Sequence, residues 1–401
     1  MHRLAILFVV LIVYGSLYPF SGWQALHGAP LFGFLGALPD YIEKADVVQN
    51  VLAYIPFGLF TVAALRRRVA GGTALGLALL AGGLLSLTME SLQQWLPSRD
   101  ASLADLALNL LGTQAGAMLA LVLNGHSWAG ARLLDLRRQW LRGGTLANLG
   151  LGALALWALS QTSPLVPSFD VGQLRSALAP LYWAVLQPGR IELLQLLVYA
   201  CYLAALGLML RLLVRPERSA LWLFSLVVAL VFGLKVLMQS RQLGPEAVLG
   251  AGAAWLALAL CARMARPASV ARAGSALLVL GFAFSELAPG AFGRFVDFNW
   301  LPLVGQMASI SGLQNILEVS WPFFAIAIFA RLLAEPAQWR HVALAGGGLV
   351  IAVVFALEWW QQALPGRHGD ITQVMLAWAG WMLPWTFQGS ENSEQEATTP
   401  S

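Results

Sequence analysis

The chain has 401 residues, of which 58% are hydrophobic and only 11% charged, and its mean hydropathy is +0.69. A soluble domain carries about 25% charged residues, so this composition excludes a water-soluble globule and predicts a protein whose surroundings are the lipid bilayer. The net charge of +4 comes from arginines in short segments, which indicates no nucleic-acid partner. Two cysteines in apolar runs and five scattered histidines predict no metal site, and no cofactor motif is present.

Twelve apolar segments approach the roughly 20 residues that a helix needs to cross a bilayer. In chain order they are 4–20, 46–65, 73–95, 103–123, 146–163, 191–210, 219–240, 246–262, 273–288, 313–331, 341–362 and 371–387. The first is predicted to be a retained helix, because no small-residue cleavage site follows it closely. The polar tail 389–401 is predicted to be disordered and cytoplasmic. The fold class is therefore predicted to be all-α, a polytopic transmembrane helix bundle.

Basic residues are divided unevenly between the two sides of this predicted bundle. Sixteen of the 24 lie in the N-terminus and in every second loop, and seven lie in the alternate loops. The last one, Lys235, falls inside a predicted span. The positive-inside rule then predicts cytoplasmic N- and C-termini. On this topology the segments after residues 95 and 362 face outward.

Two stretches far apart in the chain carry nearly the same sequence. Glu90-Ser-Leu-Gln-Gln-Trp-Leu-Pro-Ser-Arg99 returns as Glu358-Trp-Trp-Gln-Gln-Ala-Leu-Pro-Gly-Arg367, with six of ten positions identical. A weaker copy surrounds Lys235, where the glutamate is replaced and the Pro-x-Arg is missing. An internal repeat of this kind decides the architecture. It predicts three repeated four-helix units, at 1–125, 146–263 and 273–387.

The repeated phrase predicts a polar cluster near the outer surface. Its carboxylate and two amides are spaced i, i+3, i+4 and share one helix face. The proline ends the helix, and the arginine two residues later can fold back over it. Acids and amides elsewhere in the spans are further candidates, since ionisable groups inside a membrane are costly unless used or paired. The predicted ligand-binding residues are Glu90, Gln93, Gln94, Arg99, Asp105, Asn50, Glu358, Gln361, Gln362, Arg367, Asp370, Glu318 and Lys235.

Each candidate also has a structural interpretation. Glu90 and Arg99 can form a closed ion pair that fastens one helix to the next. Asp105, three residues after Ser102, and Asp370 both fit the pattern of residues that cap a helix N-terminus. Lys235 is predicted either to reach a repeated glutamate in a shared polar cavity or to extend its ammonium to the membrane interface.

With these residues assembled, the chain resembles the VanZ-like family of membrane proteins. The resemblance covers 1–125 and rests on Ser16-Leu-Tyr-Pro19-Phe20, Asp46-x-x-x-Asn50, Pro56-Phe57-Gly58, Ser86-x-x-x-Glu90-x-x-Gln93, Pro97-x-Arg99, Asp105 and Asn109-x-x-Gly112. Residues 273–387 are similar to a divergent second copy, with Ala377 where the first has Asn109. The resemblance implies a multi-pass protein of the bacterial cytoplasmic membrane, a role in the cell envelope and an association with glycopeptide antibiotic resistance.

Three functions are compatible with these observations. The first is non-enzymatic binding or handling of an amphipathic envelope molecule at the outer face: a lipid-linked glycan, a phospholipid or a lipoglycopeptide. Arginines would take phosphate or carboxylate, and glutamine pairs would take sugar hydroxyls. The second is a membrane-embedded enzyme with Glu90 or Glu358 as general base. The third is a scaffold in a polysaccharide assembly complex. The absence of a nucleophile, metal or cofactor motif favours the non-enzymatic functions.

Overall fold

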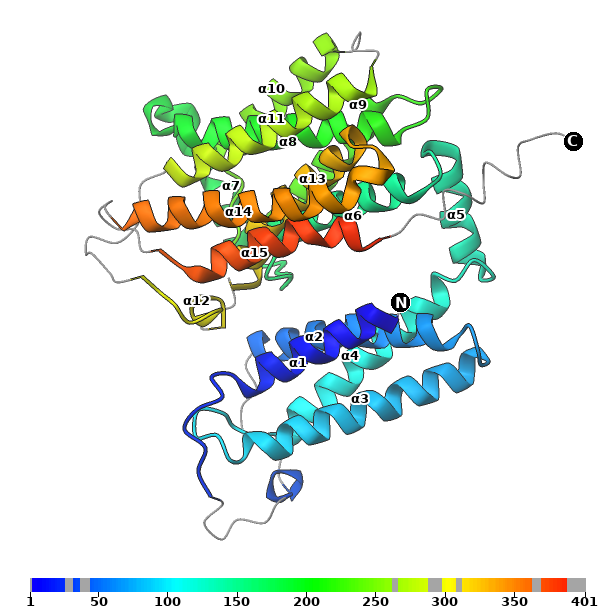
Figure 1. The fold of residues 1–401 in the computed structure, drawn as a ribbon. Helices are drawn as coiled ribbons and strands as arrows, with labels where there is room; N and C mark the ends of the chain where they lie inside the picture. Colours follow the sequence, from blue (N-terminus) through cyan, green and yellow to red (C-terminus); the bar gives the residue numbers. More distant parts are fainter. Residues whose placement is uncertain are drawn as a thin grey trace, which may run out of the picture. The chain divides into compact units, whose positions relative to one another are not determined.

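The computed structural model describes residues 2–25, 32–36, 44–261, 266–287, 298–307, 312–362 and 369–387. In this part of the chain the secondary structure is helical, with isolated β-bridges and no strand (Figure 1). The chain divides into two compact units, which we call unit 1 (Met1–Arg137) and unit 2 (Arg138–Ser401). The prediction of an all-α bundle is confirmed.

Every predicted apolar segment contains a helix. Unit 1 holds α1 (His2–Leu17), η1 (Gly33–Gly36), α2 (Lys44–Leu65), α3 (Gly71–Gln93), α4 (Leu103–Val122) and most of α5 (Trp128–Trp140), whose last three residues belong to unit 2. Unit 2 holds α6 (Thr145–Thr162), α7 (Val171–Leu186), η2 (Pro188–Arg190), α8 (Leu193–Leu213), α9 (Ala220–Leu237), α10 (Pro245–Leu260), α11 (Pro267–Leu287), α12 (Val304–Met307), α13 (Gly312–Leu333), η4 (Pro336–Gln338), α14 (Trp339–Gln361), α15 (Ile371–Met382) and η5 (Leu383–Thr386).

Not all of these helices have the length of a membrane span. Among the described residues, eight helices are long and apolar enough to cross a membrane, and α1 and α10 contain shorter apolar stretches. The helices α6 and α15 coincide with predicted segments but fall outside both groups. Three further helices, α5, α7 and α12, lie where the sequence predicts loops. The chain is therefore a multi-pass membrane protein with additional helices between its spans.

Unit 1 is built around the close packing of α2 against α4. Glycines on these helices remove the side chains that would keep the backbones apart. A Cβ placed at Gly112 would overlap the carbonyl oxygen of Val51, and one at Gly116 would overlap that of Ile55. Small residues at the interface are the usual means by which membrane helices approach closely. This contact brings the start of α4 next to α2 and α3, where the candidate residues lie.

Unit 2 has its core along α8 and α13. In each of these spans 56% of the residues in an 18-residue apolar stretch are buried, against 28% in the other six long spans. The helices α10 and α11 pack on α8, while α15, α11 and α6 pack on α13. The largest fully buried side chains of this core include Trp157, Leu206, Leu278, Trp321 and Phe329. The boundary predicted between 146–263 and 273–387 does not appear as a division into compact units, and it stays a prediction.

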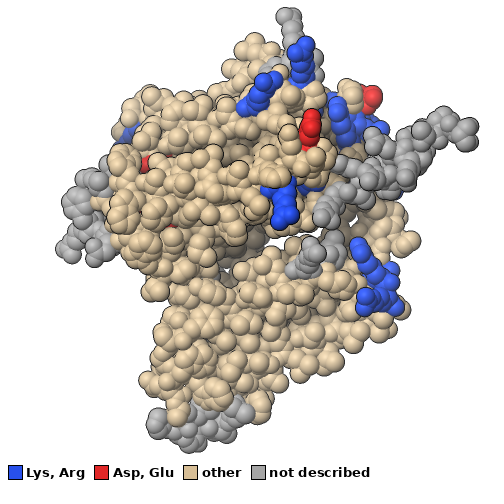
Figure 2. Space-filling view, viewed as in Figure 1, with Lys and Arg blue, Asp and Glu red and all other residues tan. Residues whose placement is uncertain are grey.

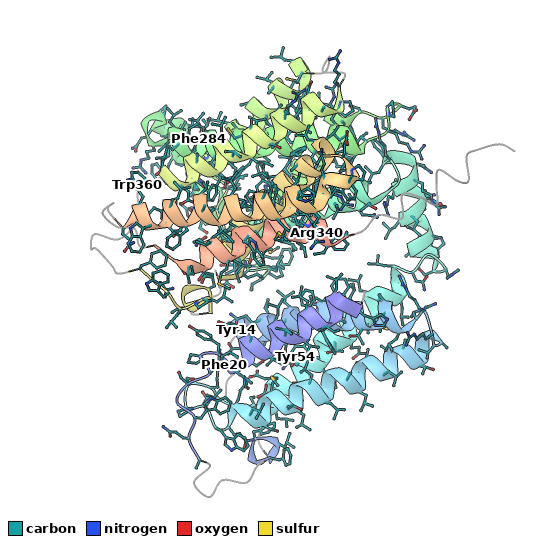
Figure 3. The ribbon with its side chains drawn as sticks, viewed as in Figure 1. Tyr14, Phe20, Tyr54, Phe284, Arg340 and Trp360 are labelled. Atoms are coloured by element: carbon teal, nitrogen blue, oxygen red, sulfur yellow. The ribbon has the colours of Figure 1, made fainter. Side chains whose placement is uncertain are left out.

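Basic side chains gather toward one end of unit 2 (Figure 2). Arg340, in the first turn of α14, lies at this end, whereas Phe284 and Trp360 lie toward the opposite end (Figure 3). The two ends of the bundle therefore differ in charge, as the loop arginines predict. The charge difference supplies a testable basis for orientation in the membrane.

Candidate functional site

Glu90 joins the end of α3 to the start of α4. Its side chain is only 3% exposed, and its Oε2 accepts a hydrogen bond of 2.8 Å from the backbone N–H of Ser102. Ser102 is the N-cap of α4, and its own side chain accepts from the N–H of Ala104 at 3.1 Å. A carboxylate at a helix N-terminus satisfies an amide that the helix leaves unpaired and interacts favourably with the helix dipole. Ser102 is confirmed as the N-cap, but Asp105 does not complete a capping box, because the Ser102 N–H donates to Glu90 instead.

Arg99 serves a different helix from Glu90. Its Nη2 donates to the carbonyl oxygen of Gly15 at 3.0 Å, and its Nε donates to that of Tyr18 at 3.3 Å. Gln93 adds a third contact at the same place, from Nε2 to the carbonyl oxygen of Ser16 at 2.9 Å. Cationic and amide donors at a helix C-terminus satisfy its last carbonyls. Arg99 therefore caps α1, and the predicted ion pair between Glu90 and Arg99 is not formed.

Asn50 and Asp105 connect α2 to α4 near the same end. The amide nitrogen of Asn50 donates to Oδ1 of Asp105 at 2.7 Å. Both side chains are partly buried, and Asp105 lies in the first turn of α4. Gln94, in contrast, donates locally to the carbonyl oxygen of Ser91 at 3.4 Å. Five of the six candidates from the first part of the chain thus contact other helices at one end of unit 1.

Four buried polar side chains are grouped in unit 1, and we call them the polar core of unit 1: Tyr54, Ser86, Glu90 and Asn109. Asn109 donates from Nδ2 to the Ser86 hydroxyl at 2.9 Å. The Asn109 Oδ1 is buried without a hydrogen-bond partner. The Tyr54 hydroxyl lies near Ser86 and Glu90, but it too is buried outside hydrogen-bonding geometry. An unsatisfied buried polar group costs about 1–3 kcal/mol, so the polar core lowers the stability of unit 1.

Sequence reasoning found only part of this polar core. Ser86 and Asn109 entered through the family resemblance, and Tyr54 was missed. Tyr54 follows Asn50 by one helical turn in α2. A polar side chain at i+4 from another inside an apolar span is the signal that could have found it.

Glu358 in unit 2 makes the same contact as Glu90. It is buried at the end of α14, and its Oε2 accepts from the backbone N–H of Asp370 at 2.9 Å. Asp370 is the N-cap of α15, with its Oδ1 accepting from the N–H of Thr372 at 2.8 Å. Gln361 donates to a carboxylate oxygen of Glu286 at the end of α11. Arg367 lies outside the described residues, and Gln362 donates locally to the carbonyl oxygen of Trp359 at 3.3 Å.

The polar core has no counterpart below Glu358. Val354 precedes Glu358 by four residues, as Ser86 precedes Glu90. Ala377 follows Glu358 by nineteen residues, as Asn109 follows Glu90. Both replacements are buried in an apolar cluster. The helix-capping glutamate is thus common to both places, whereas the positions of Ser86 and Asn109 are apolar below Glu358.

Lys235 is buried, its hydrogen-bond partners are neutral, and Glu318 is close enough to interact with it electrostatically. The lysine side chain is 4% exposed, and its Nζ donates to Oε1 of Gln161 at 3.0 Å and to the Tyr199 hydroxyl at 3.1 Å. The ammonium therefore neither pairs with Glu358, which lies in the same unit, nor extends to the interface. The next helix, α10, begins at Pro245, and its N-cap position makes no side-chain hydrogen bond of the kind that Glu90 and Ser102 make at α4. The predicted shared cavity is not supported within unit 2.

Arg241 supplies the contact that the sequence appeared to lack around Lys235. Its Nε and Nη2 donate at 3.2 Å to the carbonyl oxygens of Gln161 and Ser160 at the end of α6, as Arg99 does for α1. Its Nη1 donates to Gln314, whose amide nitrogen donates to Glu318 at 2.7 Å. Burial lowers the pKa of Arg241, which nearby Glu318 partly offsets. Arg241 was missed because it follows Lys235 by six residues rather than nine.

The described residues contain no group of three histidine, cysteine or acidic side chains placed to hold a metal ion. No curated protein and no solved structure matches this chain. The model of one protein family, described as VanZ/LLP1, matches residues 3–124. This range contains α1 to α4, the Glu90 cap and the whole polar core. The N-terminal part of this membrane protein is therefore VanZ-like.

Proposed function

We propose that unit 1 binds the polar headgroup of an amphipathic cell-envelope molecule at the outer face of the cytoplasmic membrane. The residues 146–263 and 273–387 would be two further copies of the same unit that act as its scaffold. The observation that carries this proposal is the polar core of unit 1, whose Ser86 and Asn109 are replaced by valine and alanine at the equivalent positions around Glu358.

The glycines of the close helix contacts identify the equivalent positions around Glu358. Gly380 would overlap Ser320 of α13 if it carried a Cβ, as Gly112 would overlap Val51. Three residues before these glycines stand Ala377 and Asn109, respectively. Four residues before the two glutamates stand Val354 and Ser86, respectively. All four side chains are buried.

This comparison distinguishes residues that the fold requires from residues that a ligand would require. Valine and alanine fill the two positions around Glu358, so the helix packing there does not require serine and asparagine. Unpaired polar atoms in the interior destabilise a protein unless something uses them. A hydrogen-bonding ligand group that enters between α2, α3 and α4 would satisfy the Asn109 Oδ1 and the Tyr54 hydroxyl. We infer that the polar core is retained for such a group.

The chemistry of the polar core favours a ligand rich in hydrogen-bond donors. Asn109 and Glu90 offer acceptor oxygens, and Tyr54 offers a hydroxyl that can donate or accept. Arg99 is engaged with α1 and is poorly placed to take a phosphate. Sugar hydroxyls of a lipid-linked glycan or lipoglycopeptide, or the ammonium of a phospholipid, fit this set. The acyl or prenyl chain would remain in the bilayer beside unit 1.

The double variant Ser86→Val with Asn109→Ala tests this proposal. Because valine and alanine occur at the equivalent positions around Glu358, we expect the melting temperature to hold or rise. The amount of the co-purifying envelope molecule, identified by mass spectrometry of the purified protein, should fall about tenfold or more, since each lost hydrogen bond to a charged or polar partner contributes about 1–3 kcal/mol.

The reverse exchange in unit 2 provides the matched control. Val354→Ser with Ala377→Asn should lower the melting temperature and leave the co-purifying molecule unchanged. If the unit 1 variant instead melts lower and retains the same molecule, the polar core is a structural fastening and the binding proposal is wrong.

The orientation is a separate prediction, based on the loop arginines. Alkaline phosphatase fused after Arg99 or Arg367 should be active, because the enzyme folds only outside the cytoplasm. Fusions after Arg68 or Arg138 should be inactive. The opposite pattern of activities would place the polar core near the cytoplasmic face and exclude a ligand of the outer leaflet.

A further inference from the structure

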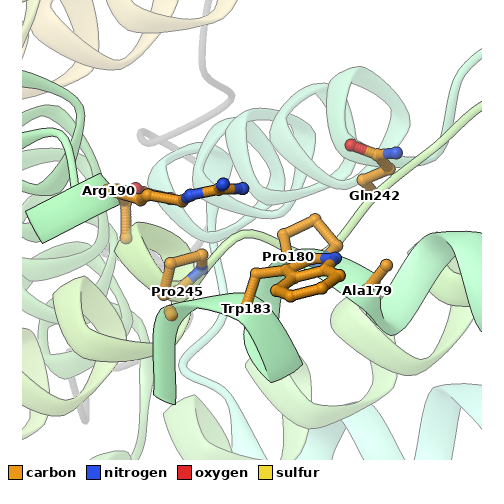
Figure 4. Close-up of a pocket in the computed structure, with 8 residues that line it drawn as sticks. Ala179, Pro180, Trp183, Arg190, Gln242 and Pro245 are labelled. Atoms are coloured by element: carbon orange, nitrogen blue, oxygen red, sulfur yellow. The ribbon is translucent and has the colours of Figure 1, made fainter. Parts of the chain in front are cut away.

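A pocket of about 400 Å³ opens in unit 2 between α7, η2 and the start of α10 (Figure 4). It lies apart from the Glu358 cap and from the Lys235 cluster. Its walls include Pro180, Trp183, Arg190, Gln242, Pro245 and Glu246. The pocket thus combines an aromatic ring, a cation, an amide and a carboxylate.

Arg190 has its charged group available to a ligand. The guanidinium carbon lies 5.6 Å from the centroid of the Trp183 ring, a cation–π distance. Within the part of the chain that the structure describes, the guanidinium makes no hydrogen bond or ion pair. Figure 4 shows it extending across the pocket from the η2 side. The cation–π contact with Trp183 holds the guanidinium in place. Its N–H groups remain free for an anion, which a guanidinium binds bidentately.

The pocket also contains hydrogen-bond acceptors. Glu246 is held at the start of α10, where its Oε1 accepts from the backbone N–H of Glu192 at 3.1 Å, two residues after Arg190. The Gln242 amide stands on the far side of the pocket from Arg190 (Figure 4). A carboxylate and an amide accept hydrogen bonds from hydroxyl or ammonium groups. The pocket therefore suits a headgroup that carries both an anion and hydrogen-bond donors.

The outer surface of α7 indicates that this headgroup belongs to a lipid. The first half of α7 is tied to the α9–α10 segment, by Gln173 Nε2 to the Met238 carbonyl oxygen at 2.8 Å and by the Leu243 N–H to the Ala177 carbonyl oxygen at 2.9 Å. Its second half exposes large apolar side chains next to the pocket, namely Leu178, Tyr182, Trp183, Val185 and Leu186. In a membrane protein, an apolar surface of this kind is stabilised by contact with lipid.

We propose that this pocket binds the phosphodiester headgroup of a membrane lipid that also carries hydroxyl or ammonium donors. Arg190 takes the phosphate, Glu246 and Gln242 take the donors, and the acyl chain lies along the exposed side of α7. The site is in a different unit from the polar core and recognises an anion, so it is independent of the function proposed for unit 1.

Native mass spectrometry of the full-length protein in detergent, titrated with defined lipids, tests the proposal. Phosphatidylglycerol and phosphatidylethanolamine should bind about tenfold more tightly than phosphatidylcholine, whose headgroup has no donor. Arg190→Gln should weaken phosphatidylglycerol binding about tenfold or more, and Trp183→Ala should weaken it less, because the guanidinium remains but is no longer held. Arg175 is an exposed arginine of α7 that lies outside the pocket, so Arg175→Gln should change binding less than twofold.

Three outcomes would overturn the proposal. Equal losses in Arg190→Gln and Arg175→Gln would mean that surface charge alone attracts the lipid. Competition by soluble glycerol phosphate as effective as that of phosphatidylglycerol would mean that the pocket takes a free phosphate and α7 plays no part. Equal binding of all three lipids would mean that the pocket does not recognise the headgroup. Unchanged melting temperatures confirm that the variants are folded, as expected for exposed side chains.

Discussion

Gly116→Val is expected to disrupt the packing of α2 against α4 and to lower the free energy of unfolding by about 3 kcal/mol or more. A Cβ at this position would overlap the carbonyl oxygen of Ile55. The obstructing atom is backbone, so no rotamer change can relieve the overlap and the two helices must separate. Thermal unfolding of the purified protein, followed by circular dichroism, measures the loss.

Gly76→Val is the matched control for this variant. Gly76 lies within α3, and a Cβ there meets no atom within 4 Å. The same chemical change should therefore be tolerated, or even stabilise the helix slightly, since glycine is a poor helix former. Equal destabilisation by the two variants would show that valine in these helices, rather than the α2–α4 contact, causes the effect.

Glu90→Ala is expected to destabilise the start of α4 by about 2–3 kcal/mol, because a buried hydrogen bond to a charged group is lost and the Ser102 N–H is left without an acceptor. Glu90→Gln should retain part of this stability, since its amide oxygen can still accept. Hydrogen exchange at 102–106 should accelerate in the alanine variant, and Glu358→Ala should do the same at 370–374.

A double-mutant cycle distinguishes this role from the ion pair that the sequence suggests. Glu90 contacts Ser102, and Arg99 contacts Gly15 and Tyr18, so the two side chains share no partner. The effects of Glu90→Gln and Arg99→Ala on the free energy of unfolding should therefore add to within about 0.5 kcal/mol. A coupling well above this value would restore the closed ion pair.

The function proposed for unit 1 depends on the difference between capping and ligand binding. Glu90 and Glu358 have the same acceptor role at a helix start, which explains why a glutamate stands at both positions. Capping alone does not explain Ser86, Asn109 and Tyr54 below Glu90. The repeated sequence around Glu90 and Glu358 thus has a helix-capping role, and Ser86, Asn109 and Tyr54 carry the functional hypothesis.

The sequence alone determined the features that depend on local properties of the chain. A helix that crosses a membrane must satisfy its own backbone hydrogen bonds and must be apolar over its length, so composition was enough to find every predicted helical segment. Helix caps are equally local, because the cap and the amide that it binds lie two or three residues apart. Ser102 and Asp370 were recognisable for this reason. The resemblance of 1–125 to the VanZ-like family also came from sequence.

Only the tertiary structure decided which polar groups meet. Arg99 contacts carbonyl oxygens more than eighty residues away, and Lys235 contacts Gln161 and Tyr199 on two other helices. Such pairs depend on the rotation and depth of each helix in the bundle, which apolar patterns do not specify because lipid and protein interior are both apolar. The pocket beside α7 was hidden for the same reason, since its walls come from two separate stretches of chain that meet only when α7 folds onto the start of α10.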